Sequence, residues 1–407
     1  MIQADINKKG IPFWKRPISF TMLIDVFIVL YITSVYTFSY NEMNFVSKIL
    51  AFALMALLAI YVLQKKAIKI DGLGICLGLF TVICLLSGLW AINISMAFSK
   101  TMTMVQIFIL VVLLYNYIQS EKKAELFISI MCIAATVFAI YTLFYFGPEE
   151  YFRGIEEGDR IGTEISNVNA IGMTTAASVL LNIWYAFCKK KPLHVFMAAI
   201  CLVVSLGSGS RTAIVGLLFG IVALFFFKDK GVKKIVGLLE CFAILFVLYL
   251  ILQLPAFDIF MERIDGMIAG VLGEGRPDHS TQLRLDMIEQ GLKTFYEYPL
   301  SGIGIGNSSI ITEELGYSTY LHNNYVELLS GVGLIGTVIY YLMFIIPFGK
   351  LIKPALKQNQ EAIIAVVLIL VNLVFHFGTV QYYNKITSLY IILFFICTYK
   401  VKEKSDA

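Results

Sequence analysis

The sequence predicts an all-α integral membrane protein with about twelve transmembrane helices, both termini in the cytoplasm and one large extracytoplasmic loop with amphipathic helices. Hydrophobic residues make up 58% of the 407 residues, and charged residues only 15%. Apolar runs of about 20 residues, the length that spans a bilayer core, recur along the chain. The net charge of +4 reflects membrane topology, so no nucleic-acid partner is expected.

The expected transmembrane helices follow the apolar runs in order. They cover residues 18–40, 45–64, 72–91, 101–118, 126–147, 167–188, 193–207, 210–228, 232–254, 326–348, 361–380 and 385–400. The chain is therefore expected to divide into helices one to nine (1–254), a large loop (255–325) and helices ten to twelve (326–407).

Lysines follow every even-numbered span, as Lys65 and Lys66 do after the second and Lys122 and Lys123 after the fourth. The positive-inside rule places these lysines and both termini in the cytoplasm. The first apolar run is too long for a secretory signal and lacks a small-residue cleavage site, which indicates an anchor. The seven cysteines lie within or at the ends of spans without a CxxC pair, so neither a disulfide nor a metal site is expected.

Arginine follows a different pattern from lysine. Only one of the seven arginines, Arg16, falls on the cytoplasmic side. The six assigned to the outer face are Arg153, Arg160, Arg211, Arg263, Arg276 and Arg284. Guanidinium binds phosphate or carboxylate through two parallel hydrogen bonds, so this distribution indicates an anionic ligand outside. For Arg153, Arg263 and Arg276 the favoured alternative is pairing with nearby acids.

Arg211 lies in LGSGSRTAIVG, the very short outer turn between the seventh and eighth spans. A charge at the membrane surface is costly unless it is paired, which favours a functional role. The small residues 207–210 would let a ligand approach the backbone, and Ser210 could cap the eighth helix, whose N-terminus favours anions. Snorkelling of Arg211 toward lipid headgroups is the alternative.

The outer segment from about residue 255 to 321 is too long for a bare connector. PAFDIFMERIDGMIAGVL predicts a helix along the interface, and STQLRLDMIEQGLKTFYEYPL predicts a second amphipathic helix with Arg284 in its first turn. SGIGIGN resembles a phosphate loop only superficially, because it has neither a βαβ context nor a GKS or GKT sequence. Close approach of its backbone to a lipid-linked substrate and a plain turn both remain open.

TYLHNNYVELLSGVGLIG places His322 and Asn323 at the outer N-terminus of the tenth span. The positive end of a helix would hold a nearby imidazole neutral, the form that accepts a proton from a hydroxyl. Asn323 or Asn324 could orient the ring or cap the helix, and Glu327 lies about one turn below. A capping or core histidine is the alternative.

The other histidines have less favourable surroundings. His194 follows a cytoplasmic lysine run, and His279 lies in a polar break of the long loop. His376 is interpreted as a packed polar residue near the outer end of the eleventh span, with a place in the site as the alternative.

Taken together, the SRT turn, YPLSGIGIGN and HNNYVELLSGVGLIG resemble the O-antigen polymerase and O-antigen ligase superfamily. The resemblance covers residues 155–348 by motif, and it includes GDRIGTEISNVNAIG with Arg160. It implies a glycosyltransferase of the bacterial cytoplasmic membrane, active on the extracytoplasmic face without a metal or other cofactor. The implied substrates are undecaprenyl-diphosphate-linked glycans, as donor and as acceptor. Further expected partners are the lipid bilayer, a flippase and a chain-length regulator.

In such an enzyme His322 would be the catalytic base, and Arg211, Arg284 and Arg160 would bind the diphosphate. Asn323, Glu327 and Ser210 would support them. Polymerisation of O-antigen, capsule or exopolysaccharide repeat units and ligation of a finished glycan to another acceptor both fit these motifs. A polysaccharide or lipid transporter is the more distant alternative, because few ionisable groups lie within the spans.

Overall fold

The computed structural model describes residues 19–38, 42–65, 68–157, 161–162, 165, 167–259, 261–262, 264–266, 279–313, 315–317 and 319–406, and within these ranges the regular structure is entirely helical. The first half comprises α1 (Phe20–Phe38), α2 (Asn44–Lys65), α3 (Gly72–Ser87), α4 (Ile94–Ser120), α5 (Ala124–Phe146), α6 (Pro148–Glu156), α7 (Val168–Ile183) and the π-helical η2 (Trp184–Cys188). The second half comprises α8 (Leu193–Gly207), α9 (Arg211–Lys228), α10 (Lys233–Leu252), η3 (Pro255–Phe257), α12 (His279–Glu297), α13 (Ser308–Glu313), α14 (Asn324–Leu356), α15 (Gln360–Phe375) and α16 (Lys385–Asp406).

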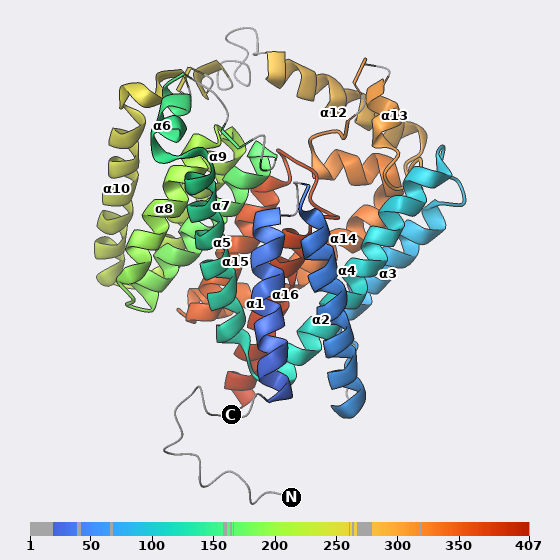
Figure 1. The fold of residues 1–407 in the computed structure, drawn as a ribbon, viewed down its shortest axis with the longest axis horizontal. Coiled ribbons are helices and arrows are strands. Elements are labelled where there is room, and N and C mark those ends of the chain that lie inside the picture. The colour runs from blue at the N-terminus through green and yellow to red at the C-terminus, as the bar shows by residue number, and fades with distance from the viewer. Residues whose placement is uncertain are drawn as a thin grey trace, which may run out of the picture.

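Most long helices run between two ends of the bundle (Figure 1). We call the end that carries α12 and α13 the loop end; α16 finishes at the opposite end. Every expected span coincides with a helix. In the described part of the chain, eight helices are long and apolar enough to cross a membrane, and α3, α8 and α15 are apolar but shorter. The protein is therefore a multi-pass membrane protein.

The outward faces of α2 and α10 carry large exposed apolar side chains. They include Phe45, Ile49, Phe52 and Leu63 on α2, and Ile235, Leu239, Phe242 and Phe246 on α10. Contiguous exposed apolar surface of this kind is rare on soluble proteins. These faces are suited to contact with lipid.

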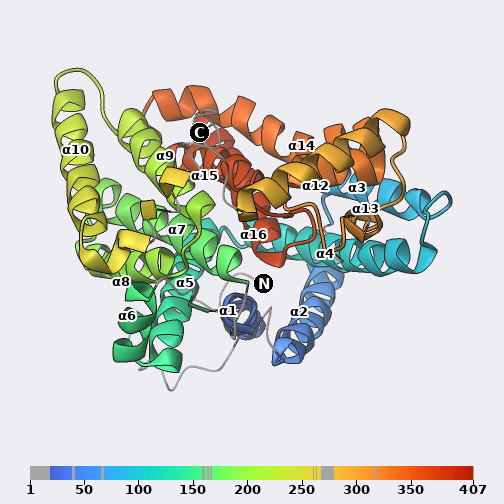
Figure 2. The ribbon, with the colours of Figure 1, turned by 90° about the horizontal axis from the view of Figure 1, so that it is seen from above.

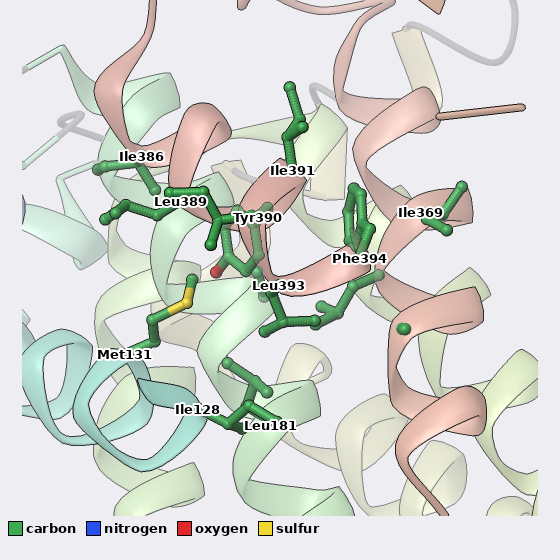
Figure 3. Close-up of a cluster of buried hydrophobic side chains, with 14 of the residues drawn as sticks. Ile128, Met131, Leu181, Ile369, Ile386, Leu389, Tyr390, Ile391, Leu393 and Phe394 are labelled. Atoms are coloured by element: carbon green, nitrogen blue, oxygen red, sulfur yellow. The ribbon is translucent and has the colours of Figure 1, made fainter. Parts of the chain in front are cut away.

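The core surrounds α16, which lies in the middle of the bundle when viewed from the loop end (Figure 2). Leu389, Tyr390 and Leu393 of α16 lie beside Met131 of α5 and Leu181 of α7 (Figure 3). All five side chains are buried. The helices that connect to the polar loops are thus closely packed through apolar side chains.

Two helices, α4 and α14, are longer than the expected spans. α4 begins about two turns before residue 101, because the Asn93 side chain accepts a hydrogen bond from the Met96 N–H and caps the helix there. α14 begins at Asn324 and continues to Leu356, beyond the expected end.

α14 is broken at Gly333, whose φ of 66° and ψ of −172° are not helical. The break frees two carbonyl groups, which accept hydrogen bonds from outside the helix. The Ile303 N–H donates to the Ser330 oxygen at 2.8 Å, and the Gly304 N–H donates to the Gly331 oxygen at 2.9 Å. The segment 298–307, here called the glycine loop, therefore fills the break.

The glycine loop is held equally closely on its other side by the turn between α3 and α4. The buried Asn307 accepts a hydrogen bond from the Asn93 N–H at 2.6 Å and donates to the Asn93 oxygen at 3.3 Å. A Cβ on Gly302 would collide with the backbone of Gly331, and one on Gly304 would collide with Ala91. These glycines serve close backbone packing, so the loop is a structural connection between α3, α4 and α14.

Candidate functional site

The start of α14 lies at the loop end and carries the histidine expected there. Asn323 caps the helix, since its Oδ1 accepts hydrogen bonds from the N–H groups of Tyr325 at 3.0 Å and Val326 at 3.1 Å. His322, just before the cap, has a φ of 54°. A residue with a side chain in this left-handed region costs about 1–3 kcal/mol, and such positions cluster at functional sites.

Asn324 fixes the same turn to the connection between α15 and α16. Its N–H donates to the His376 oxygen at 2.8 Å, and its Nδ2 donates to the Tyr341 hydroxyl at 3.1 Å. Its Oδ1 accepts from the N–H groups of Gln381 at 2.7 Å and Tyr382 at 3.0 Å. Asn324 is fully buried and therefore acts as a structural connector.

Glu327 holds the chain on both sides of the site. Its side chain is buried, and its Oε2 accepts a hydrogen bond from the Leu321 N–H at 3.1 Å. Its Oε1 accepts from the Ser308 hydroxyl at 2.6 Å. The carboxyl group thus ties the residue before His322 to the first residue of α13.

The His322 ring packs against Tyr320, with ring centroids 4.3 Å apart. The Tyr320 hydroxyl in turn accepts a hydrogen bond from Asn167 Nδ2 at 3.1 Å. Asn167 caps α7, because its Oδ1 accepts from the Asn169 N–H at 2.9 Å. The histidine therefore lies beside the start of α7.

A polar cavity of about 390 Å³ opens beside these residues. It is lined by Ser95, Met96, Ser99, Lys100, Gly306, Ser308, Ser309, Thr319, Tyr320, Glu327 and Tyr383. The Lys100 Nζ lies 3.6 Å from the centroid of the Tyr383 ring, a cation–π contact. The cavity combines a cation, a carboxyl group and several hydroxyls, which are groups that can hold a sugar or its anionic carrier.

Arg211 is the first residue of α9 and is half-buried at the loop end. Ser210 occupies the capping position, but its hydroxyl makes no capping hydrogen bond, so the expected cap is wrong. The reason is packing against α7, because a Cβ on Gly172 would collide with Ser208 and Ser210. The Ser210 side chain is buried in that contact.

α7 contacts a neighbour of Arg211 and a neighbour of His322. Ser210, directly before Arg211, packs against Gly172, while Asn167 at the start of α7 binds the tyrosine beside His322. Asn167 and Gly172 are about 7–8 Å apart along the axis, at 1.5 Å per residue.

The segment after α15 makes a second connection. Its Gly378 packs so closely against Thr212 of α9 that a Cβ would collide with the threonine side chain. The His376 oxygen accepts the Asn324 N–H. The starts of α9 and α14 are therefore connected through two intermediate segments, α7 and the segment after α15.

α12 carries Arg284, which is half-buried, across the start of α14. One turn further, Met287 is buried in a cluster with Leu321 and Val326. A Cβ on Gly291 would collide with the same two side chains. Arg284 is thus attached to the loop end through the residues that flank His322.

The other arginines that were assigned to the outer face divide into two groups. Arg160, Arg263 and Arg276 lie outside the described residues. Arg153 pairs with Glu157, with a nitrogen–oxygen distance of 4.0 Å, which confirms the interpretation as an ion pair.

His376 and His194 have structural surroundings. His376 is fully buried, with Nδ1 3.2 Å from the Tyr341 hydroxyl and its ring against Phe344, as expected for a packed polar residue. His194 contacts Asn182 at 2.8 Å and stacks on Tyr185.

Sequence reasoning missed Lys100 and Tyr383 as cavity residues. Lys100 carries a usable signal, because this lysine precedes an expected outer-to-inner span, whereas the lysine clusters follow the even-numbered spans. Tyr383 carries none, since its contact with Lys100 joins parts of the chain that are far apart in sequence.

Residues 196–341 match a family model described as O-Antigen ligase. The matched region contains Arg211, Arg284, the glycine loop and His322. This match supports the resemblance of residues 196–341 to the O-antigen ligase and polymerase superfamily, whose members are glycosyltransferase-like enzymes. A search of curated protein sequences found no match.

Proposed function

We propose that the protein is a membrane glycosyltransferase that polymerises undecaprenyl-diphosphate-linked repeat units of an O-antigen, capsule or exopolysaccharide. The observation that carries the proposal is that α7 and the segment after α15 each contact both the start of α9, which carries Arg211, and the start of α14, which follows His322. Transfer from a lipid diphosphate needs a cationic group for the leaving group and a base for the acceptor. In this proposal Arg211 supplies the cationic group and His322 supplies the base.

In the proposed reaction, an acceptor hydroxyl oxygen bonds to the anomeric carbon of the donor as the bond from that carbon to the diphosphate oxygen breaks. His322 takes the hydroxyl proton. Arg211 and Arg284, with Arg160, bind the departing lipid diphosphate through bidentate hydrogen bonds. Guanidinium groups supply the positive charge, so the proposal assigns no role to a metal or other cofactor.

Asn323 and Glu327 have supporting roles in this scheme. Asn323 fixes the helix start that follows His322, and Glu327 fixes the backbone that precedes it. Ser210 is assigned to packing beneath Arg211, where its side chain contacts α7.

The proposed topology has about twelve spans, with both termini in the cytoplasm and the loop end on the outer face of a bacterial cytoplasmic membrane. Spans one to nine (1–254), the large loop (255–325) and spans ten to twelve (326–407) are the proposed divisions. A flippase would deliver the donor to this face, and a chain-length regulator would act on the product.

Ligation of finished glycan to another acceptor is the second candidate, favoured by the description of the matched family model. Both reactions use the same donor chemistry. They differ in whether the acceptor is another lipid-linked repeat unit.

The test uses purified protein in lipid with an undecaprenyl-diphosphate-linked oligosaccharide from the host. A ladder of lipid-linked repeats that is lost in His322→Asn supports polymerisation. Transfer only after a second acceptor is added identifies a ligase. Absence of transfer with either acceptor, together with movement of the lipid-linked glycan across vesicles, overturns the proposal in favour of a transporter.

A further inference from the structure

A second hollow, much smaller than the polar cavity, lies along α4. It is lined by Tyr31, Lys48, Ala51, Phe52, Met55, Thr103, Gln106, Ile107, Leu110 and Lys385, and we call it the lysine groove. The α4 residues of the cavity, including Met96 and Lys100, continue at helical spacing to Thr103 and Ile107 in the groove. Both spaces therefore lie along one face of α4.

Three lysines mark this face. Lys48 and Lys385 line the groove, and Lys100 lines the cavity beside it. None of the ion pairs found among the described residues includes any of these lysines. Like charges that share one hollow repel each other, and charge near the membrane interior is costly. An anion between the lysines would offset both costs.

The rest of the groove is mainly apolar. Further along α2 and α4 it is lined by Phe52, Met55, Ile107 and Leu110. Phe52 is 58% exposed and belongs to the outward apolar face of α2. A ligand with an anionic head and a hydrocarbon chain fits this order of side chains, with its chain directed toward the bilayer.

We propose that the lysine groove binds the diphosphate and first isoprene units of a second polyprenyl-diphosphate-linked glycan, the acceptor. Its glycan would extend along the polar cavity toward His322. This inference rests on the proposed function. In polymerisation the donor gives up its diphosphate at the arginines, whereas the acceptor keeps its own and needs a separate cationic site.

The first test measures how many undecaprenyl diphosphate molecules bind one chain, by native mass spectrometry of protein in neutral phosphatidylcholine nanodiscs. Two molecules are expected for the wild type. One is expected for the double variant Lys48→Gln and Lys385→Gln, and one for the double variant Arg211→Gln and Arg284→Gln. Lys293→Gln is the matched control, because Lys293 lies on α12 and pairs with Glu289; it should still bind two.

A single bound molecule in the wild type, lost in the arginine variant, would overturn the inference. Displacement of the second molecule by an equal concentration of phosphatidylglycerol would also overturn it, because the groove would then select only negative charge. Two bound molecules in the lysine double variant would also overturn the inference.

The second test separates this inference from the proposed function. Loss of Lys48 and Lys385 should raise KM for a diphosphate-linked acceptor by about tenfold or more, and leave KM for the same glycan on a neutral alkyl chain unchanged. Equal increases for both acceptors would overturn the inference. If neither the wild type nor any variant transfers glycan, the proposed function fails. The number of bound diphosphate lipids still decides the role of the groove.

Discussion

Glu327 accepts a hydrogen bond from the backbone of Leu321 at 3.1 Å, so a buried carboxyl group inside α14 holds the residue that precedes His322. The same group accepts from Ser308. The position of the proposed base thus depends on a side chain in the first turn of the helix that follows it.

Replacing Glu327 tests this dependence. Glu327→Ala leaves two buried donors without their acceptor, at about 1–3 kcal/mol each, so the unfolding temperature and the glycan-transfer rate should both fall. Glu327→Gln keeps an acceptor oxygen and should retain most of both. Loss of transfer in Glu327→Gln at an unchanged unfolding temperature would instead show that the carboxyl group takes part in the reaction.

The left-handed backbone of His322 dictates how its side chain should be replaced. Asparagine tolerates a positive φ better than alanine does. His322→Asn should therefore unfold at nearly the wild-type temperature and transfer glycan at least about a hundredfold more slowly, as expected for loss of a general base. His322→Ala should lose transfer as well and also unfold earlier. A normal transfer rate in His322→Asn would exclude His322 as the base.

Arg211 and Arg284 are proposed to bind the diphosphate through both nitrogens of the guanidinium fork. Lysine keeps the charge but removes this geometry. Arg211→Lys and Arg284→Lys should each slow transfer about ten- to a hundredfold, equivalent to about 1.5–3 kcal/mol for a charged hydrogen bond. Arg153→Lys is the matched control, because Arg153 already pairs with Glu157 on an exposed surface. An equal loss in the control would indicate a general effect of surface charge.

The helices could be predicted from sequence because bilayer thickness fixes the length of an apolar run. The cap by Asn323 could be predicted because capping depends on neighbouring residues. The break at Gly333 could not, since SGVGLIG continues the apolar pattern and the groups that satisfy the freed carbonyls come from the glycine loop.

For the site as well, only features that depend on neighbouring residues could be predicted. His322 and Arg211 stand out as polar residues beside membrane spans, which is a local signal. The contact of Lys100 with Tyr383 and the packing of Ser210 on Gly172 arise from tertiary structure. Ser210 was predicted to cap its own helix because local sequence carries no sign of α7 beside it.

Two glycines of α14 provide a direct test of the helix break. Gly333 has a φ of 66°, and a Cβ there would collide with the Leu300 backbone. Gly349 has no heavy atom within 4 Å of the corresponding position. Gly349→Ala should therefore leave the protein unchanged or stabilise it by up to about 1 kcal/mol, the helix preference of alanine over glycine.

Gly333→Ala should have the opposite effect. It combines a positive-φ backbone conformation that is essentially restricted to glycine, at about 1–3 kcal/mol, with a collision against backbone that has little freedom to move. We expect a lower unfolding temperature and faster hydrogen exchange at Ile303 and Gly304, whose N–H groups bond to the broken turn. Equal unfolding temperatures and equal exchange for the two alanine variants would show that α14 runs continuously and that the glycine loop is held by other contacts.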